Sequence, residues 1–525
     1  MLHEFLHLVI AFYGFPEGFC RLVEGIYFLN FAYIDIAGQL IFLLTYLSGV
    51  LQGCPLSGML FTICLDPFLI WLNAVIKDDA LLRACADDLG AALGKLEVLC
   101  RVEPVFQVAK DIAGLTLKPS KCVIVPLVGS LNEDIAAMYS DWMATHVPNW
   151  RNFKIQEAGK YLGFWLGPKA ANKLWIGPFS KYKERTKAIA GANTAAASTA
   201  IAYNRDAITV LGYHAQLLFF PSSFYKEERV SFSRLLKIPH NSLGNALPFR
   251  WAELGGIIFT SMKVLNFSAM FRTAFKTIPT WRDSYTSLRE TAEHHLPFVQ
   301  IMAGKLCPSF WDTTPIIDNL QSASKGFVDL PGQTIPEGLL RNLRDGPNVQ
   351  KQIGIKLLPN LHPTPFPKVF KERLHSMLPE FSQELQTVNW QRVLHELAQS
   401  KRCFATMCCI KTWCKAWTTS ARMHDGTQMS CLFGCKDCGD CEEHYLRCDR
   451  LWNPIFQTLN IAPYNDLLQR LAVEGPSKKR FLTLAVVFVV YHKHRAQARQ
   501  HGAQVISNAA DVRNSARAAA SLVQF

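Results

Sequence analysis

The spacing of apolar residues in the first part of the chain predicts helices followed by short strands. Residues 4–13 and 17–29 have apolar residues at helical spacing, and Gly14-Phe15-Pro16 separates them. Residues 60–76 form a nearly continuous apolar run, which predicts a buried helix, and residues 82–93 predict two short strands around a polar turn. The first 77 residues contain only two basic residues, Arg21 and Lys77, and a segment this apolar is expected to lie inside a domain whose beginning is missing.

Further along, residues 121–127 and 160–166 are strand candidates because they are rich in β-branched and aromatic residues. Strands mixed with helices in this order predict an α+β domain that ends near Gly167. Residues 188–202 are rich in alanine and residues 203–300 keep helical periodicity, so both segments are expected to be helical.

The C-terminal part is predicted to be mostly helical. Four prolines in residues 359–367 indicate a linker. A basic helix is expected around residues 478–499, and the alanine-rich tail after it is expected to be frayed or disordered. Another predicted helix carries four cysteines that we interpret as core residues: Cys403, Cys408, Cys409 and Cys414.

Composition narrows the class of protein. Of 525 residues, 49% are hydrophobic and 18% are charged, which argues against extensive disorder. The net charge of +13 favours a polyanionic partner, either nucleic acid or an acidic membrane surface. By itself this signal is weak, because many basic proteins bind neither. No signal peptide is recognised, residues 43–76 are interrupted by glycine and by Asp66-Pro67, and residues 482–491 are too short to span a bilayer. We therefore expect a nuclear or cytoplasmic protein without a membrane segment, and the oligomeric state stays open.

Basic residues gather after the predicted α+β domain. Residues 169–187 contain six basic residues and one acid, interleaved with Trp175, Phe179 and Tyr182. Lysines placed between aromatic residues suit a surface that contacts phosphates and stacks bases, and a solvated helix face is the alternative. Residues 478–480 and 493–499 suit either nucleic-acid binding or a nuclear-localisation patch.

Two adjacent carboxylates, Asp87 and Asp88, are flanked by apolar residues, which is costly unless they are exposed or bind a cation. For the pair alone an exposed turn is the simpler explanation, because aspartate is common in turns. Upstream, Gly49 and Gly53 predict a loop in which the backbone can approach a ligand closely, and Gln52 adds a flat amide to that loop. The loop and the pair together favour a ligand site over a plain turn.

These segments resemble a known family. Gly49-Val50-Leu51-Gln52-Gly53-Cys54-Pro55-Leu56-Ser57, followed by Ala86-Asp87-Asp88, resembles motifs B and C of the reverse transcriptases of non-LTR (LINE-type) retrotransposons. Gly114-Leu115-Thr116-Leu117 with Ser120-Lys121 looks like motif D, and Lys160-Tyr161-Leu162-Gly163 looks like motif E, which grips the primer. The resemblance implies nucleotide or template binding and primer contact by two groups of residues: Gly49, Gln52, Gly53, Pro55 and Lys121, and then Tyr161, Leu162 and Gly163.

The resemblance also implies polymerase chemistry with two Mg²⁺ ions, an RNA template and a DNA primer or target, with Asp87 and Asp88 as catalytic residues and Asp87 as the Mg²⁺ ligand. Adjacent residues on a strand point to opposite faces, so the two carboxylates are not expected to contribute equally. The carboxylate of motif A is missing, and Asp35, the nearest candidate, lies too close to Gln52. We therefore expect an N-terminally truncated RNA-directed DNA polymerase that cannot polymerise unaided.

Nine of the sixteen cysteines fall within residues 403–448, which suits metal binding in a reducing compartment. Thiolates with one imidazole suit a tetrahedral Zn²⁺ ion, and free thiols in a loop are the alternative. Cys438 and Cys441 lie inside the cluster, and either could replace Cys435 as a ligand. The ligands expected from knuckle-like spacing are Cys431, Cys435, His444 and Cys448.

The expected fold is α+β, a partial right-hand polymerase followed by a mostly helical C-terminal region with a small zinc knuckle. Its predicted parts are a palm in residues 1–170, a helical thumb in 171–300, a connector in 301–400, a Cys/His knuckle region in 401–460, and a basic helix with an alanine-rich tail in 461–525. The main rival is a non-catalytic remnant that binds RNA or DNA through thumb and knuckle. A non-functional pseudogene product is the third hypothesis.

Overall fold

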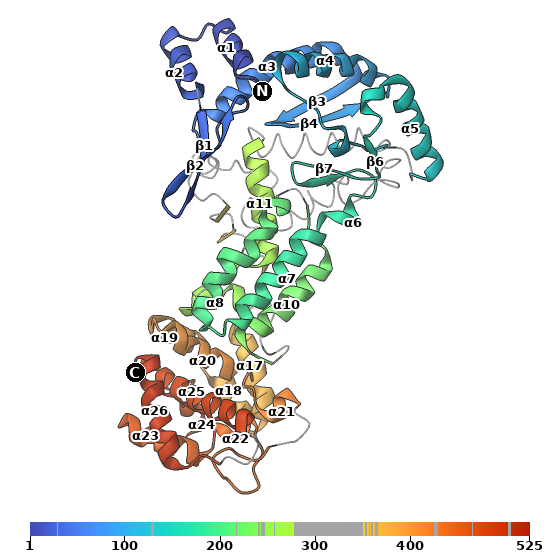
Figure 1. Ribbon diagram of the computed structural model, residues 1–525. Helices are drawn as coiled ribbons and strands as arrows, with labels where there is room; N and C mark the ends of the chain where they lie inside the picture. The colour runs from blue at the N-terminus through green and yellow to red at the C-terminus, as the bar shows by residue number, and fades with distance from the viewer. Residues whose placement is uncertain are drawn as a thin grey trace, which may run out of the picture. The chain divides into compact units, whose positions relative to one another are not determined.

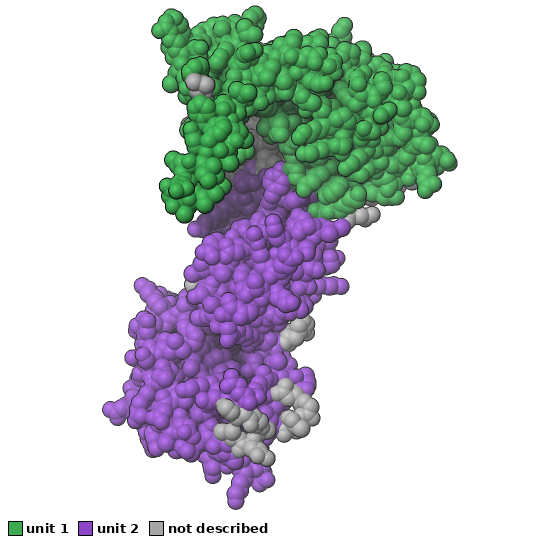
Figure 2. Space-filling model, viewed as in Figure 1, with its two compact units in different colours: residues 1–174, 300–311 green, residues 175–299, 312–525 purple. Residues whose placement is uncertain are grey.

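The computed structural model of the chain (Figure 1) divides into two compact units, which are coloured separately in Figure 2. Unit 1 contains residues 1–174 and 300–311, and unit 2 contains residues 175–299 and 312–525. The end of the predicted thumb, the first part of the predicted connector and much of the predicted linker lie outside the described residues. The structure describes residues 1–28, 30–127, 131–216, 218–239, 242, 247–256, 258–277, 350–351, 354–355, 358, 361–362, 366–424, 429–464, 466–501 and 506–525.

Unit 1 begins with two helices, α1 (His3–Phe12) and α2 (Glu17–Tyr27), as the apolar spacing predicts. A hairpin that the sequence analysis does not predict follows them, with the antiparallel strands β1 (Asn30–Ile36) and β2 (Gln39–Tyr46). The chain then enters the predicted buried helix, α3 (Ser57–Ile76).

The rest of unit 1 alternates helices with short strands, which confirms a mixed helix-and-strand class for this part of the chain. The helices and strands after α3 are β3 (Ala80–Cys85), β4 (Asp88–Leu93), α4 (Val98–Ala113), β5 (Val123–Ile124), α5 (Glu133–His146), β6 (Lys154–Ile155), β7 (Gly159–Tyr161), β8 (Phe164–Leu166) and α6 (Ala171–Leu174).

The strands pair only locally. β3 with β4 and β7 with β8 form antiparallel hairpins, and β5 with β6 forms a parallel pair. Within the described residues these pairs and β1–β2 are four separate two-stranded sheets. Because no single sheet joins them there, the polymerase palm stays a prediction.

Helix α3 is the centre of unit 1. It continues through Asp66 and Pro67, as the helix predicted over residues 60–76 does. Its N-terminal half packs with α1 and α2, and its C-terminal half packs with α4 and the β3–β4 hairpin. In the described part of the chain, residues 57–79 are the one helical segment long and apolar enough to cross a membrane. A core helix passes the same test, so this is weak evidence for a span.

Unit 2 is helical in its described residues, apart from one isolated bridge between Ser430 and Gly439. Its α-helices are α7 (Ile176–Gly191), α8 (Ala196–Ala202), α9 (Gly212–Ala215), α10 (Ser222–Leu236), α11 (Met262–Thr277), α17 (Phe366–Met377), α18 (Ser382–Thr387), α19 (Trp390–Gln399), α20 (Cys403–Trp413), α21 (Ser420–Met423), α22 (Glu442–Tyr445), α23 (Asp449–Leu459), α24 (Leu467–Arg470), α25 (Lys478–His501) and α26 (Ala509–Val523).

One apolar cluster runs through unit 2, from Tyr182 on α7 to Val523 on α26. The cysteines of the α20 region are core residues as predicted, since Cys408, Cys409 and Cys414 are buried while Cys403 is half-buried. The predicted basic helix is α25. Its central residues 481–491 are buried apart from the half-buried Val489, and most of them belong to the same cluster. It is therefore a core helix with basic ends.

The alanine-rich tail is helical and packed, so the expectation of fraying is wrong. Asn508 and Asp511 form a capping box at the start of α26, in which each side chain accepts a hydrogen bond from the other residue's backbone N–H. Val512 and Ala516 are fully buried, and α26 packs against α23 and α25. Small alanine side chains allow this close approach between helices.

Candidate functional site

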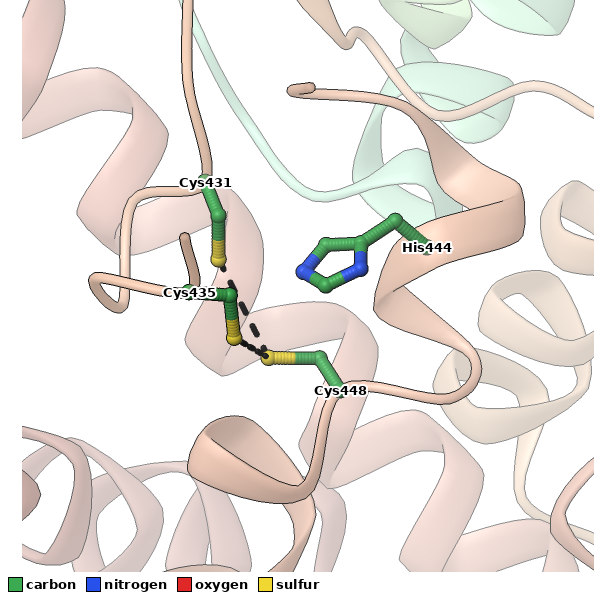
Figure 3. Close-up of side chains that lie close together, drawn as sticks. All are labelled: Cys431, Cys435, His444 and Cys448. Atoms are coloured by element: carbon green, nitrogen blue, oxygen red, sulfur yellow. Dashed lines mark hydrogen bonds between the residues drawn. The ribbon is translucent and has the colours of Figure 1, made fainter. Parts of the chain in front are cut away.

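Four side chains of the predicted knuckle converge in unit 2, and Figure 3 shows the imidazole of His444 directed toward three thiols. The Sγ atom of Cys448 lies 3.9 Å from that of Cys431 and 3.6 Å from that of Cys435. One possible ligand atom from each of the four residues lies within 4.8 Å of the others. These separations suit four ligands around one tetrahedral ion, so the Cys₃His group could hold zinc.

Local structure explains how the ligands are presented. Cys431 lies beside the Ser430–Gly439 bridge, and its backbone N–H donates to the carbonyl of Cys438 at 2.8 Å. Gly434 has a φ of +79°, a left-handed conformation that suits glycine, and turns the chain toward Cys435. His444 lies on the short helix α22, and Cys448 occupies the N-cap position of α23. A bridge, a glycine turn, a short helix and a helix N-cap therefore bring the four ligands to one point.

Burial makes a cation the natural partner of this group. Cys431 and Cys448 are each 2% exposed, and Nε2 of His444 is buried without a hydrogen-bond partner. A hydrogen bond between the Cys431 and Cys448 thiols lowers the pKa of Cys431, and the same bond together with burial raises the pKa of Cys448. A bound dication would favour deprotonation of the three cysteine thiols, and Nε2 of His444 could coordinate it as the fourth ligand.

The geometry favours one of the alternatives that the sequence left open. Cys435 belongs to the converging group, and neither Cys438 nor Cys441 does among the described residues. Cys441 lies at the N-cap position of α22, where burial raises the pKa of its thiol. Zinc is the metal that this ligand set suits, and Cys435 is the favoured third thiolate.

Residues without metal-binding chemistry hold the knuckle in the core. The hydroxyl of Tyr445 accepts a hydrogen bond from the backbone of Leu432 at 3.1 Å, and the indole N–H of Trp452 donates to the carbonyl of Tyr445 at 3.0 Å. Tyr445 and Trp452 are fully buried. The spacing of the ligands in the sequence gives no signal of this support.

A buried ion pair lies next to the knuckle. Asp440 and Arg495 are 1% and 2% exposed, and Arg495 Nε lies 3.5 Å from Asp440 Oδ2. Asp440 also accepts hydrogen bonds from the hydroxyl of Tyr491 at 2.9 Å and from the backbone of Ser420 at 2.6 Å. These contacts join α21, the knuckle and α25, and the spacing of residues in the sequence gives no signal of them.

The two catalytic candidates lie where the sequence places them, at the tip of a hairpin. Cys85 pairs with Asp88 across the β3–β4 hairpin, so Ala86 and Asp87 form its two-residue turn, with Ala86 at a φ of +51°. Asp87 and Asp88 are both exposed. Within the described residues, the knuckle is the one group of three or more His, Cys, Asp or Glu side chains that converges. The structure therefore gives no support for the predicted Mg²⁺ ion at Asp87.

The β7–β8 hairpin, predicted to grip a primer, lies against the β3–β4 hairpin. The hydroxyl of Tyr161 donates to the carbonyl of Arg83 at 3.3 Å. A methyl group added at Gly90 would lie 3.0 Å from the Tyr161 ring, so the two hairpins are in close contact. Leu162 and Gly163, with φ values of +46° and +84°, form the turn of the second hairpin. Two segments that are remote in sequence are thus neighbours.

The glycine loop is open on its outer side. Gly49 and Gly53 have φ values of +92° and +87°, and a methyl group added at either would meet no atom within 4 Å. Hydrogen bonds hold both ends of the loop. Gly49 N–H donates to the carbonyl oxygen of Met1 at 2.7 Å, and the hydroxyl of Ser57 donates to the carbonyl oxygen of Leu51 at 2.6 Å. Gln52 and Pro55, between these ties, are exposed.

Lys121, the remaining nucleotide-binding candidate, is exposed but lies outside a strand. It ends a short 3-10 helix (Pro119–Lys121), and its N–H donates to the carbonyl of Lys118 at 2.9 Å. β5 begins two residues later, at Val123, so the strand predicted from residue 121 is shorter than expected.

On α7 the basic residues and the aromatic residues have different surroundings. Lys181, Lys183 and Lys187 are exposed, which suits contact with phosphates. Tyr182 is fully buried, and the half-buried Phe179 stacks on Phe224 with ring centroids 3.7 Å apart. The expectation that these aromatic residues stack bases is therefore wrong, because their rings pack in the core of unit 2.

Comparison with models of known protein families found no match, and comparison with curated proteins found none either. The likeness to reverse transcriptases therefore rests on the residues quoted for it in the sequence.

Proposed function

We propose that the chain is a reverse-transcriptase-related protein of retrotransposon origin that binds nucleic acid and does not polymerise by itself. The observation that carries the proposal is the contact between the β3–β4 hairpin, with Asp87 and Asp88 at its tip, and the β7–β8 hairpin through Tyr161. In a polymerase of this kind, the segment that holds the primer end must lie next to the carboxylates that bind the catalytic metal.

The number of available ligands supports the proposed lack of catalysis. A two-metal site needs several oxygen ligands in near-octahedral geometry, with carboxylates from more than one segment. Asp87 and Asp88 are adjacent and exposed, and no third acidic side chain converges on them among the described residues. Both carboxylates therefore suit weak, solvent-screened cation binding better than a polymerase site.

Binding of RNA or DNA is supported by charge. The net charge is +13, and α7 presents Lys181, Lys183 and Lys187 to solvent. Lysines on one exposed helix can contact successive phosphates, and each contact strengthens binding most at low salt. The Cys₃His group would contribute indirectly, since its ligands are mostly buried and hold the helices of unit 2 together.

Two assays on the full chain test the proposal. Filter binding to single-stranded RNA should show an affinity that falls steeply with salt, and Lys181→Ala/Lys187→Ala should weaken binding about tenfold and flatten the salt dependence by about 1.4 in slope. Lys368→Ala/Lys401→Ala, which removes the same charge from two other exposed positions of unit 2, is the matched control and should change binding less.

Primer extension with Mg²⁺ and deoxynucleotides should give no incorporation. Incorporation that disappears in Asp87→Ala would replace the proposal with an active polymerase. Absence of RNA and DNA binding at low salt would remove the nucleic-acid role altogether.

A further inference from the structure

The β1–β2 hairpin forms an arm of unit 1 (Figure 1) that is apolar on both faces. A two-stranded hairpin alone is marginally stable in water, and an exposed apolar patch larger than a few hundred Å² marks an interaction site. Eleven large apolar side chains of this arm are each 43–76% exposed: Phe31, Tyr33, Ile34, Ile36, Leu40, Ile41, Phe42, Leu43, Leu44, Tyr46 and Leu47.

The two faces differ in kind. Phe31, Tyr33 and Phe42 lie together on one face, with the ring of Phe42 5.9 Å from each of the other two rings. On the opposite face Ile34 pairs with Ile41 across the strands. Edge-to-face rings at this spacing form a preassembled aromatic surface, and ordering it on binding costs little side-chain entropy.

The charge of the arm limits what can cover it. Asp35 is the one charged residue in residues 30–47, and its carboxylate accepts a hydrogen bond from Gly38 N–H at 2.8 Å in the hairpin turn. Without a cation the arm has nothing to attract nucleic acid or an anionic lipid surface. Within the described residues β1 and β2 pair only with each other. In the hydrocarbon of a bilayer the backbone N–H and C=O groups on their outer edges would have no hydrogen-bond partner, which disfavours membrane insertion.

We propose that the arm is a self-association surface, through which a second copy of the chain packs its aromatic face on the first across a twofold axis. With Asp35 as its one charged residue, the arm meets its own copy with little charge repulsion, and no lysine or proline protects its edges. At about 100 Å² for each half-exposed side chain, the arm offers on the order of 1,000 Å² over its two faces, and the aromatic face supplies less than half of that area. A dimer through this face is therefore smaller than a standard interface of about 800 Å² per partner, which fits association at micromolar concentrations.

Light scattering of the full chain after size-exclusion chromatography tests this proposal. Between about 1 and about 50 µM the mass should rise toward twice the 59.1 kDa of one chain. Tyr33→Glu/Phe42→Glu should raise the dissociation constant by at least about 100-fold and leave a monomer. Ile176→Glu/Ile201→Glu, in unit 2, changes two apolar residues that are at least as exposed as Tyr33 and Phe42, and it should leave the dimer intact.

Circular dichroism and zinc content identify variants that fail to fold, and Phe42→Lys supplies an independent charge at the same face. A monomeric wild-type chain at the highest concentration overturns the proposal, whether it stays free in solution or binds neutral phosphatidylcholine vesicles. A dimer that persists in both the Glu and Lys variants overturns it as well. The proposal is independent of nucleic-acid binding, so failure of one leaves the other unchanged.

Discussion

Removal of one thiolate from the knuckle should abolish zinc binding and destabilise the whole of unit 2. Cys448→Ser deletes the sulfur that lies 3.9 Å and 3.6 Å from those of Cys431 and Cys435. Cys448 also lies at the N-cap of α23, and α23 packs against α26 in the apolar core of the unit. The variant therefore loses the metal at a point where several helices meet.

The magnitude follows from the burial of the group. A structural zinc ion contributes roughly 10–16 kcal/mol in zinc-finger peptides, where binding and folding are one process. Here a large apolar core would remain without the ion, so we expect a loss on the order of 5 kcal/mol, comparable to the total stability of many domains. At roughly 2–4 °C per kcal/mol, the melting temperature should fall by about 10–20 °C.

The assay pairs zinc content, measured by mass spectrometry of the purified protein, with thermal melting followed by fluorescence. The wild-type chain should carry about one zinc ion and Cys448→Ser about none. Cys438→Ser, which alters a half-buried cysteine outside the converging group, is the matched control and should keep both zinc and stability. Zinc that survives in Cys435→Ser but is lost in Cys438→Ser would refute the assignment of ligands, and a zinc-free wild-type protein would refute the metal centre.

Two further predictions concern buried charges. Burial raises the pKa of Glu228 from its usual 4.5 to about 8. Between pH 4.5 and about pH 8 the folded state therefore keeps a proton that the unfolded state has released, and the free energy of unfolding falls as pH rises. Glu228→Gln keeps the acceptor for Met262 N–H. In urea unfolding it should stabilise the protein by up to about 4 kcal/mol at pH 8 and by less than about 1 kcal/mol at pH 5. An equal effect at the two pH values would contradict the raised pKa of Glu228. Arg495→Met should cost about 3–5 kcal/mol because Asp440 stays buried without its cation, and a loss near zero would show that other hydrogen bonds suffice.

The sequence predicts what depends on local spacing. The four knuckle ligands lie within eighteen residues, and the short loops between them leave the chain few arrangements other than convergence. Helix α3 is predicted because its apolar run is too long for a typical strand. The choice of Cys435 over Cys438 depends on the Gly434 turn and on the hydrogen bond from Cys431 N–H, which spacing does not encode.

Other elements were missed for physical reasons. β1 and β2 lack the alternation of apolar and polar residues, because both faces of the hairpin are apolar. In the tail, Asn508 and Asp511 are a recognisable signal for a helix N-terminus. The alanine content nevertheless favoured a frayed segment, because the sequence does not show which residues pack against Val512. The aromatic residues of α7 fit a base-stacking pattern in sequence, and only the position of Phe224 shows that they face the core.

The hydrogen bond from Ser507 N–H to the carbonyl of Leu432, at 2.8 Å, joins the knuckle to the segment that leads into α26. During synthesis, residues 431–448 leave the ribosome well before this partner does. Contacts between segments so distant in sequence form late in folding, because the loop between them must close first. The segment that carries the four candidate ligands must therefore wait, partly uncovered, for residues 507–523, and during that interval its thiols are open to oxidation or to capture by another metal.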